Sequence, residues 1–279
     1  MAIDNFNPTI WSALLVDKLE KSLVFGAVAN TDYEGVISGV GSTVKINGID
    51  DLTIGDYVKN TDIAAPETLA GIERSLVIDQ ANYFNFQIDD IDKAQQTPKL
   101  MDKAMERAAY QLRDEADKYI ASLHTEVAVG NTIGNDTTPI ALTANNAYQT
   151  LVQARSVLSK TDTPTNDRWI VVPPDVYSLL LLDQRFTQAT AQGDEVLANG
   201  RVGNAAGFTI YESNNVVEAG GEFKIMFGQR DAITYASQIM KMEAYRMERR
   251  FADAAKGLHV YGAKVVRPES LGVITATVA

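Results

Sequence analysis

Residues 97–127 read TPKLMDKAMERAAYQLRDEADKYIASLHTEV, and this stretch predicts one long amphipathic helix. Apolar side chains recur every three or four residues, which places them on one face of a helix. These residues are Met101, Ala104, Met105, Ala108, Leu112, Ala116, Tyr119, Ile120 and Leu123. Charged residues fall largely on the opposite face, where Asp114–Lys118 and Arg113–Asp117 are pairs of opposite charge at i,i+4 spacing.

The ends of the predicted helix carry start and stop signals. Thr97 is the expected N-cap, Pro98 is suited to the first helical position, and Gly130 follows the run. Roughly 30 residues at ~1.5 Å per residue give a rod of about 45 Å. A rod of this length favours an elongated molecule over a sphere.

Composition narrows the function classes. The chain has 279 residues, of which 46% are hydrophobic, so it can bury one large core or two smaller ones. It has no cysteine, which excludes disulfides and thiolate metal sites. Its 36 acidic and 25 basic residues give a net charge of −11, whereas sequence-specific DNA-binding domains are usually basic. No apolar run is long enough to predict a transmembrane helix, and residues 1–22 lack the basic region followed by an apolar region that marks a signal peptide.

The sequence predicts no catalytic, cofactor-binding or metal site, and we do not expect an enzyme. The two histidines, His124 and His259, are far apart in the chain. Asp89, Asp90 and Asp92 cluster before the long helix but lack the spacing and glycine of a calcium loop, which favours a solvated turn. Phosphate-binding glycine motifs and the nucleophile elbow of hydrolases are also absent from the sequence.

Residues 33–90 change to strand-like alternation. Two alternating runs enclose the polar stretch INGIDDLTIGDYVKNTDIAAPE (46–67), which predicts a long β-hairpin with a large loop at its tip. Because a two-stranded hairpin is marginal alone in water, it needs another surface to lie on. This is the first indication of a partner.

The remaining segments predict an arm, a compact α/β unit and a set of terminal strands. Residues 1–32 are expected to form an extended arm with a short helix. Residues 128–238 predict helices at 145–159, 175–182 and 231–238 and strands at 168–174, 206–212 and 223–227. Residues 239–279 predict a strand, a short turn-helix at 252–258 and two final strands, which we expect to form a second domain with the long helix.

This order of elements is similar to that of the major capsid protein of tailed double-stranded DNA bacteriophages, whose fold is shared with encapsulins and the herpesvirus capsid floor. The resemblance spans essentially the whole chain and rests on the order and spacing of several stretches. They are PTIWSALLVDKLEKSLVFGAVANTDYEG (8–35), YFNFQIDDIDKAQ (83–95), RWIVVPPDVYSLLLLDQRF (168–186), AAGFTIYESNNV (205–216) and RFADAAKGLHVYGAKVVRPESLGV (250–273).

The resemblance implies an α+β fold with four parts. Residues 1–32 would be the N-terminal arm and residues 33–90 the extended β-hairpin loop that lies over an adjacent subunit. Residues 91–127 and 239–279 would form the peripheral domain with its spine helix, and residues 128–238 the inserted α/β axial domain. The implied function is self-assembly into an icosahedral capsid shell around phage DNA. An encapsulin-like nanocompartment shell is the alternative, and an enzyme with an α/β core is a third hypothesis.

The resemblance also implies partners. Other copies of the chain would assemble as hexamers and pentamers, and a portal protein, a decoration protein and non-specific contact with packaged DNA are further expectations. Because the arm begins almost at Met1, we expect scaffolding to be a separate protein. The chain would assemble in the host cytoplasm, without a membrane, and end in the virion.

Eight residues are candidates for contact between subunits. They are Trp11, Ile54, Asp56, Tyr57, Lys59, Arg246, Arg249 and Arg250. The basic cluster RMERR (246–250) has two interpretations: contact with DNA, scaffold or a neighbour, or an exposed strand paired with local carboxylates such as Glu243 and Glu248. Some relatives crosslink a hairpin lysine to an asparagine of another subunit, which leaves this chemistry open for Lys45 or Lys59.

Overall fold

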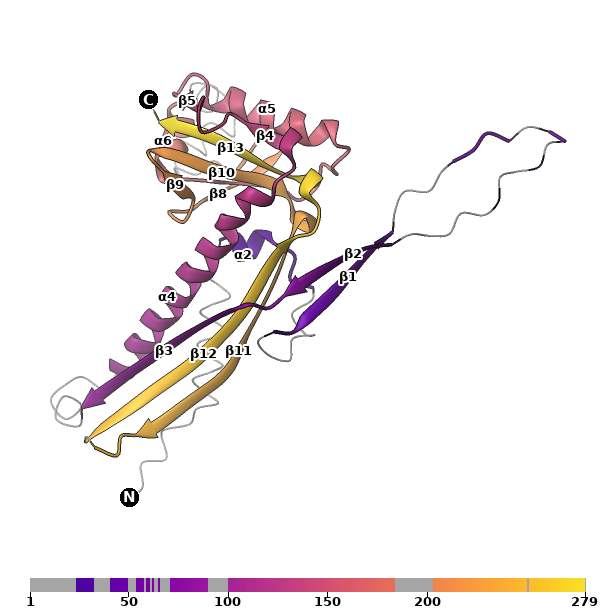
Figure 1. Ribbon diagram of the computed structural model, residues 1–279. Helices are drawn as coiled ribbons and strands as arrows, with labels where there is room; N and C mark the ends of the chain where they lie inside the picture. Colours follow the sequence, from indigo (N-terminus) through magenta and orange to yellow (C-terminus); the bar gives the residue numbers. More distant parts are fainter. Residues whose placement is uncertain are drawn as a thin grey trace.

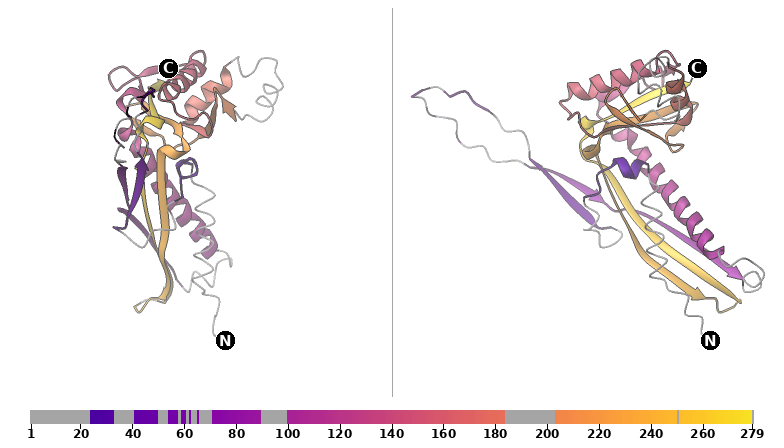
Figure 2. Two further views of the ribbon diagram at one scale, coloured as in Figure 1. Left: turned by 90° about the vertical axis from the view of Figure 1, so that its right-hand side faces the viewer. Right: turned by 180° about the vertical axis from the view of Figure 1, so that it is seen from behind.

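The computed structural model describes residues 24–32, 41–49, 71–89, 100–183, 203–249 and 251–278, together with 54–57, 59, 60, 62 and 65. The described residues form three parts, which we call the head, the body and the hairpin (Figure 1). The head holds an eight-stranded sheet with helices α5 and α6, and the body holds helix α4 and a three-stranded sheet. The hairpin is the two-stranded pair of β1 and β2 that projects from the body. Figure 2 shows the elongated shape from two further sides.

Helix α4 (Leu100–Ser122) is the long helix, and a 3₁₀ turn, η2 (Leu123–Glu126), follows it. The α-helix therefore ends earlier than the predicted Val127, and its expected N-cap lies outside the described residues. Most described residues of the predicted apolar face are buried, and Met105 and Leu112 of this face, with Ala109 beside them, pack against side chains of the body sheet.

The charged face of α4 differs from the prediction at one position. Lys118 pairs with Asp114 at 2.6 Å, as expected for the i,i+4 spacing. Asp117, in contrast, is buried, and the guanidinium of Arg113 lies 4.2 Å from the centre of the Tyr110 ring. The predicted exposure of Asp117 was wrong because α2 (Phe25–Val28), at the end of the arm, covers this turn of the helix.

The body sheet has the order β11–β12–β3, with antiparallel pairs throughout. Its strands are β3 (Gln80–Asp89), β11 (Ile233–Arg246) and β12 (Ala252–Val265). The predicted helix at 231–238 was wrong, because β11 is buried on both faces from Ile233 to Ala236 and lacks the alternation that marks a strand.

The turn-helix predicted at 252–258 was also wrong. The stretch ADAAKGL is rich in good helix formers, but β12 is hydrogen-bonded to β3 on one side and β11 on the other. Gly257 suits this strand pairing, because a Cβ at its position would lie 2.5 Å from the ring of Phe84 on β3. A side chain at this position would displace the ring of Phe84.

The hairpin pairs β1 (Thr43–Ile49) with β2 (Gly71–Val77) in antiparallel register. Its base is anchored where Val44, Ile46, Leu76 and Ile78 pack on Ala236 and Val260 of the body sheet. The prediction of one hairpin over 33–90 was wrong for residues 80–89, since β3 leaves β2 and pairs with β12. Alternation showed that a strand was present there but not which strand it joins.

The head sheet has the order β4–β13–β10–β6–β8–β7, with β5 beside β13 and β9 beside β10. Its strands are β4 (Thr132–Ile133), β5 (Ile140–Leu142), β6 (Arg168–Val172), β7 (Asn204–Ala205), β8 (Phe208–Glu212), β9 (Val217–Ala219), β10 (Glu222–Gln229) and β13 (Leu271–Val278). Helices α5 (Ala147–Lys160) and α6 (Pro174–Leu182) confirm the two helices predicted here. Short 3₁₀ turns are η3 (Val129–Asn131), η4 (Arg230–Ala232) and η5 (Pro268–Ser270).

The last strand crosses the predicted domain boundary. Residues 239–279 were expected to complete the domain of the long helix, but β13 lies in the head sheet between β10 and the short strands β4 and β5. The boundary at residue 238 is also displaced, because β11 begins at Ile233. Both differences arise from pairing between strands that are distant in the sequence, which local patterns do not report.

Candidate functional site

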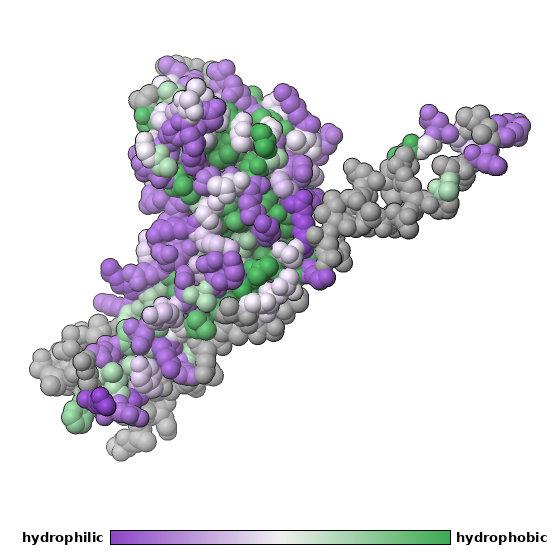
Figure 3. Space-filling view, viewed as in Figure 1, coloured by the Kyte–Doolittle hydropathy of each residue, from purple (hydrophilic) through white to green (hydrophobic). Residues whose placement is uncertain are grey.

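The tip of the hairpin carries four of the predicted contact residues on a described segment far from either core. Ile54 is 95% exposed and Tyr57 is 76% exposed, while Asp56 and Lys59 are also exposed. A hydrophobic residue is visible among the mainly hydrophilic ones at this tip in Figure 3. Large apolar side chains that are this exposed on a projecting segment are typical of a contact surface.

The far end of the body carries the predicted basic cluster. Arg246 ends β11 and pairs with Asp253 of β12 at 3.0 Å, while Arg249 lies exposed in the turn between the two strands. Of the two interpretations of this cluster, pairing with a local carboxylate describes Arg246, while Glu243 pairs with Lys256. Arg250 and Trp11 lie outside the described residues.

Sequence reasoning missed one residue at this end of the body. Phe251 is 80% exposed beside the turn, and it is the residue that immediately precedes β12. The signal that was available is a phenylalanine within a charged turn sequence, where burial in its own subunit is difficult. Arg249 and Phe251 together make this end both basic and apolar.

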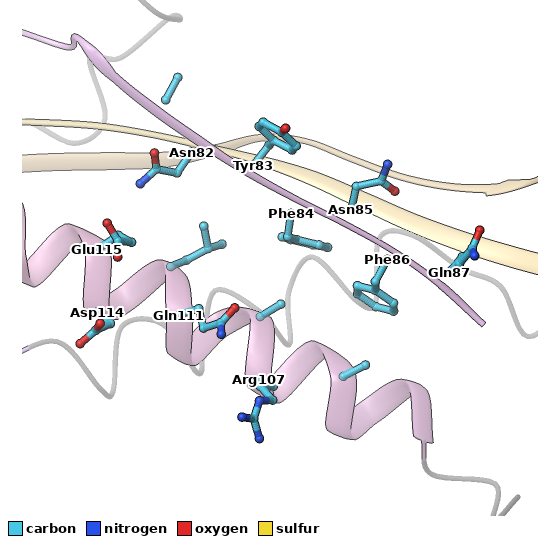
Figure 4. A pocket seen from close by; sticks show the side chains of 14 residues that line it. Asn82, Tyr83, Phe84, Asn85, Phe86, Gln87, Arg107, Gln111, Asp114 and Glu115 are labelled. Carbon is cyan, nitrogen blue, oxygen red and sulfur yellow. The ribbon is translucent and has the colours of Figure 1, made fainter.

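A groove of about 990 Å³ runs between β3 and α4. Phe84 and Phe86 point from β3 toward α4, and their rings stack at 5.9 Å, whereas Tyr83 points to the other side (Figure 4). The polar residues along the groove include Arg107 and Glu115 of α4. The groove is the open side of the contact between α4 and the sheet, and its lining has no histidine.

No catalytic centre emerges in the part of the chain that the structure describes. Among those residues, no group of three or more histidine, aspartate or glutamate side chains is placed to hold a metal ion. Of the described helices, none has the length and apolar content that a membrane crossing requires.

His259 is placed for packing and not for proton transfer. It is buried on β12, where its ring stacks on Tyr261 at 5.1 Å, and neither ring nitrogen has a hydrogen-bond partner among the described residues. Burial lowers the pKa of His259 to about 4, so the side chain is neutral at neutral pH. The side chain of His259 therefore serves in packing. Because it is neutral when buried, its protonation at acid pH should destabilise the folded protein.

Comparison with protein families gives a match over most of the chain. The profile of the phage capsid protein family, described as "Phage capsid protein", matches residues 72–275. These residues include β3, α4, nearly the whole head and both long strands of the body. A search of curated proteins found no match.

Solved structures agree with that match. A chain from Mycobacterium phage Che8 is 30% identical, with a TM-score of 0.75 and coverage of 91% of each chain. The capsid structure of Cyanophage P-SCSP1u has a TM-score of 0.73 at 16% identity and covers 92% of this chain and 89% of the other. The capsid of Ralstonia phage GP4 has a TM-score of 0.69 at 13% identity, covering 92% and 88%. At such low identity, the last two likenesses concern the fold alone.

Proposed function

The chain belongs to the phage capsid protein family, and we propose that its hairpin tip and the far end of its body are surfaces that join its copies into a shell. It is a structural protein of the capsid, present in many copies in the virion. The observation that carries the proposal is the exposure of Ile54 and Tyr57 on a hairpin whose described anchorage is only at its base.

Burial of the tip on a neighbouring copy would be favourable. Each large apolar side chain that leaves water contributes about 1.5–3 kcal/mol. Since every copy both gives a tip and receives one, a shell multiplies this gain over all its subunits. Asp56 and Lys59 add one charge of each sign near the tip, which favours a defined orientation over a simple apolar contact.

The end of the body is the second surface in this proposal. Arg246 already pairs with Asp253, so Arg249 and Phe251 are the residues offered to a neighbour. Trp11 and Arg250 remain proposed contacts on the same reasoning from sequence. The arm of residues 1–32 would reach an adjacent copy, as the capsid family implies.

Further parts of the proposal concern capsomers and other partners. The head would supply the contacts around the axes of hexamers and pentamers, with residues 128–238 joined there by β13. A separate scaffolding protein, a portal protein and an optional decoration protein would take part in assembly in the host cytoplasm. The net charge of −11 favours contact with packaged DNA that is non-specific and weak.

The contents of the purified particles distinguish a phage capsid from the encapsulin-like alternative. The matched structures named above come from phages, which favours a shell that holds a genome. Particles purified from cells that produce the virus should contain double-stranded DNA. A protein cargo in place of DNA would favour the alternative.

The hairpin tip is tested by the double substitution Ile54→Ser and Tyr57→Ser. We expect a soluble chain with unchanged circular dichroism and at least a tenfold lower yield of closed shells, since about 3 kcal/mol or more is lost per tip. Negative-stain electron microscopy and sedimentation measure the yield. Deletion of residues 50–62 should have a larger effect.

The matched control is Tyr83→Ser, which removes a similarly exposed side chain from β3 of the body, away from the hairpin tip and from the head. This variant should form shells normally. Normal shells from the double tip variant would refute the role of the hairpin tip without affecting membership of the capsid family.

A further inference from the structure

The root of the arm, residues 24–30, is a strap across the junction of head and body. Its helix α2 packs on α4, and Phe25, Val28 and Ala29 are at most 4% exposed. At its far end, the N–H of Asn30 donates to the carbonyl of Ile233 at 2.8 Å, and the N–H of Tyr235 donates to the carbonyl of Asn30 at 2.9 Å. The strap therefore joins the spine helix to the start of β11, where the chain leaves the head (Figure 1).

Asp117 of α4 holds the near end of this strap. Its side chain is 1% exposed, and its Oδ2 accepts the backbone N–H of Val24 at 3.1 Å. Its Oδ1 is buried without a hydrogen-bond partner among the described residues. A carboxylate in this position is therefore only partly satisfied where water cannot reach it.

The surrounding groups do not neutralise this carboxylate. Helix α2 brings backbone N–H groups but no titratable side chain, and the turn before β9 brings the neutral amide of Asn215. On α4 itself, Arg113 attracts the carboxylate but forms no ion pair with it, and Asp114 is already paired with Lys118.

Two other elements that pack on α4 bring no compensating charge. The one titratable residue of β9 is Glu218, which is exposed. On β12, Tyr261 is neutral, because burial raises its pKa, and the two lysines, Lys256 and Lys264, pair with Glu243 and Glu126.

We propose that Asp117 is a charge-sensitive latch for the arm root, so that residues 24–30 are held tightly when this side chain is neutral and loosely when it is ionised. Docking of the strap covers the carboxyl group, and undocking returns it to water. Burial favours the neutral form of the carboxyl group, whereas exposure to water favours the ionised form. This device acts within one subunit and does not depend on what the arm contacts.

The sign of the pH dependence follows from burial. Desolvation raises the pKa of docked Asp117 to about 6, against the hydrogen bonds from Val24 and Gly26 that lower it, whereas the value in water is 3.8. The docked state thus binds the proton more tightly, and docking strengthens as the pH falls from about 6 toward 3.8. Above about pH 6 docking is at its weakest, so the arm is easiest to release at neutral pH.

Hydrogen exchange of the purified full chain, measured by mass spectrometry, tests the latch. After correction for the intrinsic exchange rate, protection of the root amides should be roughly tenfold greater at about pH 5 than at about pH 7.5, from the two pKa values. Amides of α5 in the head provide the internal reference and should show no such change. Equal pH dependence in the root and in α5 would overturn the proposal without the need for any variant.

Two substitutions sharpen the test. Asp117→Asn keeps the shape without the charge, so root protection at about pH 7.5 should rise to the acid level and lose its pH dependence. Asp114→Asn is the matched control, since it removes a carboxylate three residues away that pairs with Lys118, and it should keep the wild-type pH dependence. A pH dependence that persists in Asp117→Asn would contradict the latch.

Discussion

The head and the body bury their apolar residues in different ways. In the head, β6 is buried along its whole length, and helices and strands enclose one large cluster around Phe227 and Phe208. In the body, a single sheet meets one helix, and the cluster between them has three fully buried members, Met105, Ala109 and Leu112. The apolar cluster of the head is therefore much larger than the one between the helix and the sheet of the body.

The two regions are nevertheless continuous at their junction. The last turns of α4 and the adjacent parts of β11 and β12 contribute Ile120, Tyr235, Tyr261 and Val265 to the core of the head. Stability should therefore decrease from the head outward along the body.

The largest expected effect is in the head. Phe227 is fully buried at the centre of β10, and its ring packs edge-to-face with Phe208 at 6.0 Å. Phe227→Ala should lower the free energy of unfolding by about 3–5 kcal/mol. Because the body is anchored in this core, urea unfolding should shift by the same amount for probes in the head and in the body. A shift confined to the head would show that the body folds independently.

Acid should act on the body through His259. The pKa of His259 is lowered to about 4 in the folded protein, against 6.5 in water, so the unfolded chain binds a proton first as the pH falls. The contribution of His259 to the free energy of unfolding is intact above about pH 6.5 and decreases between pH 6.5 and 4, by roughly 3 kcal/mol in total.

The variant His259→Leu isolates this contribution. It lacks the titrating group, so the difference in stability between it and the wild type should grow as the pH falls through that window. Asp117, which titrates in the opposite direction, is present in both proteins and cancels in the comparison. Urea titrations at several pH values measure the difference, and a constant difference would refute the prediction.

The smallest expected effect is local to the body. Leu112→Ala should cost about 2 kcal/mol, the lower end for a buried leucine, because the cluster between α4 and β3 is small and open to the groove. Hydrogen exchange should increase in β3 and in the first turns of α4 but not in α5. If α5 responded equally, the proposed gradient from head to body would be wrong.

Local patterns predicted much of the fold. The apolar period of three and four identified α4 and α5, and the alternation of Phe84 and Phe86 with polar neighbours identified β3. The same patterns failed for β11, which is buried on both faces at its start, and for the alanine-rich start of β12. The spacing of hydrophobic residues identifies an element that buries one face. The pattern disappears when both faces of the element are buried.

Contact residues were predicted less completely. Exposure of Ile54 and Tyr57 was foreseeable, because the polar stretch around them has no alternation that would bury them. Pairing of Arg246 with Asp253 was not foreseeable, since it depends on the register between β11 and β12. Phe251 was missed because the register between β11 and β12 determines where it lies relative to the turn.

Residue patterns alone were enough to predict the family, the long amphipathic helix, the compact unit that follows it and the need for partner surfaces. The three-dimensional contacts were needed to show that β13 joins the head, that β3 pairs with β12 and that Asp117 lies beneath the arm root. The physical reason is that helices and turns are encoded by neighbours in the chain. Strand partners and the burial of one carboxylate depend on contacts between residues that are, for Asp117 and Val24, 93 positions apart.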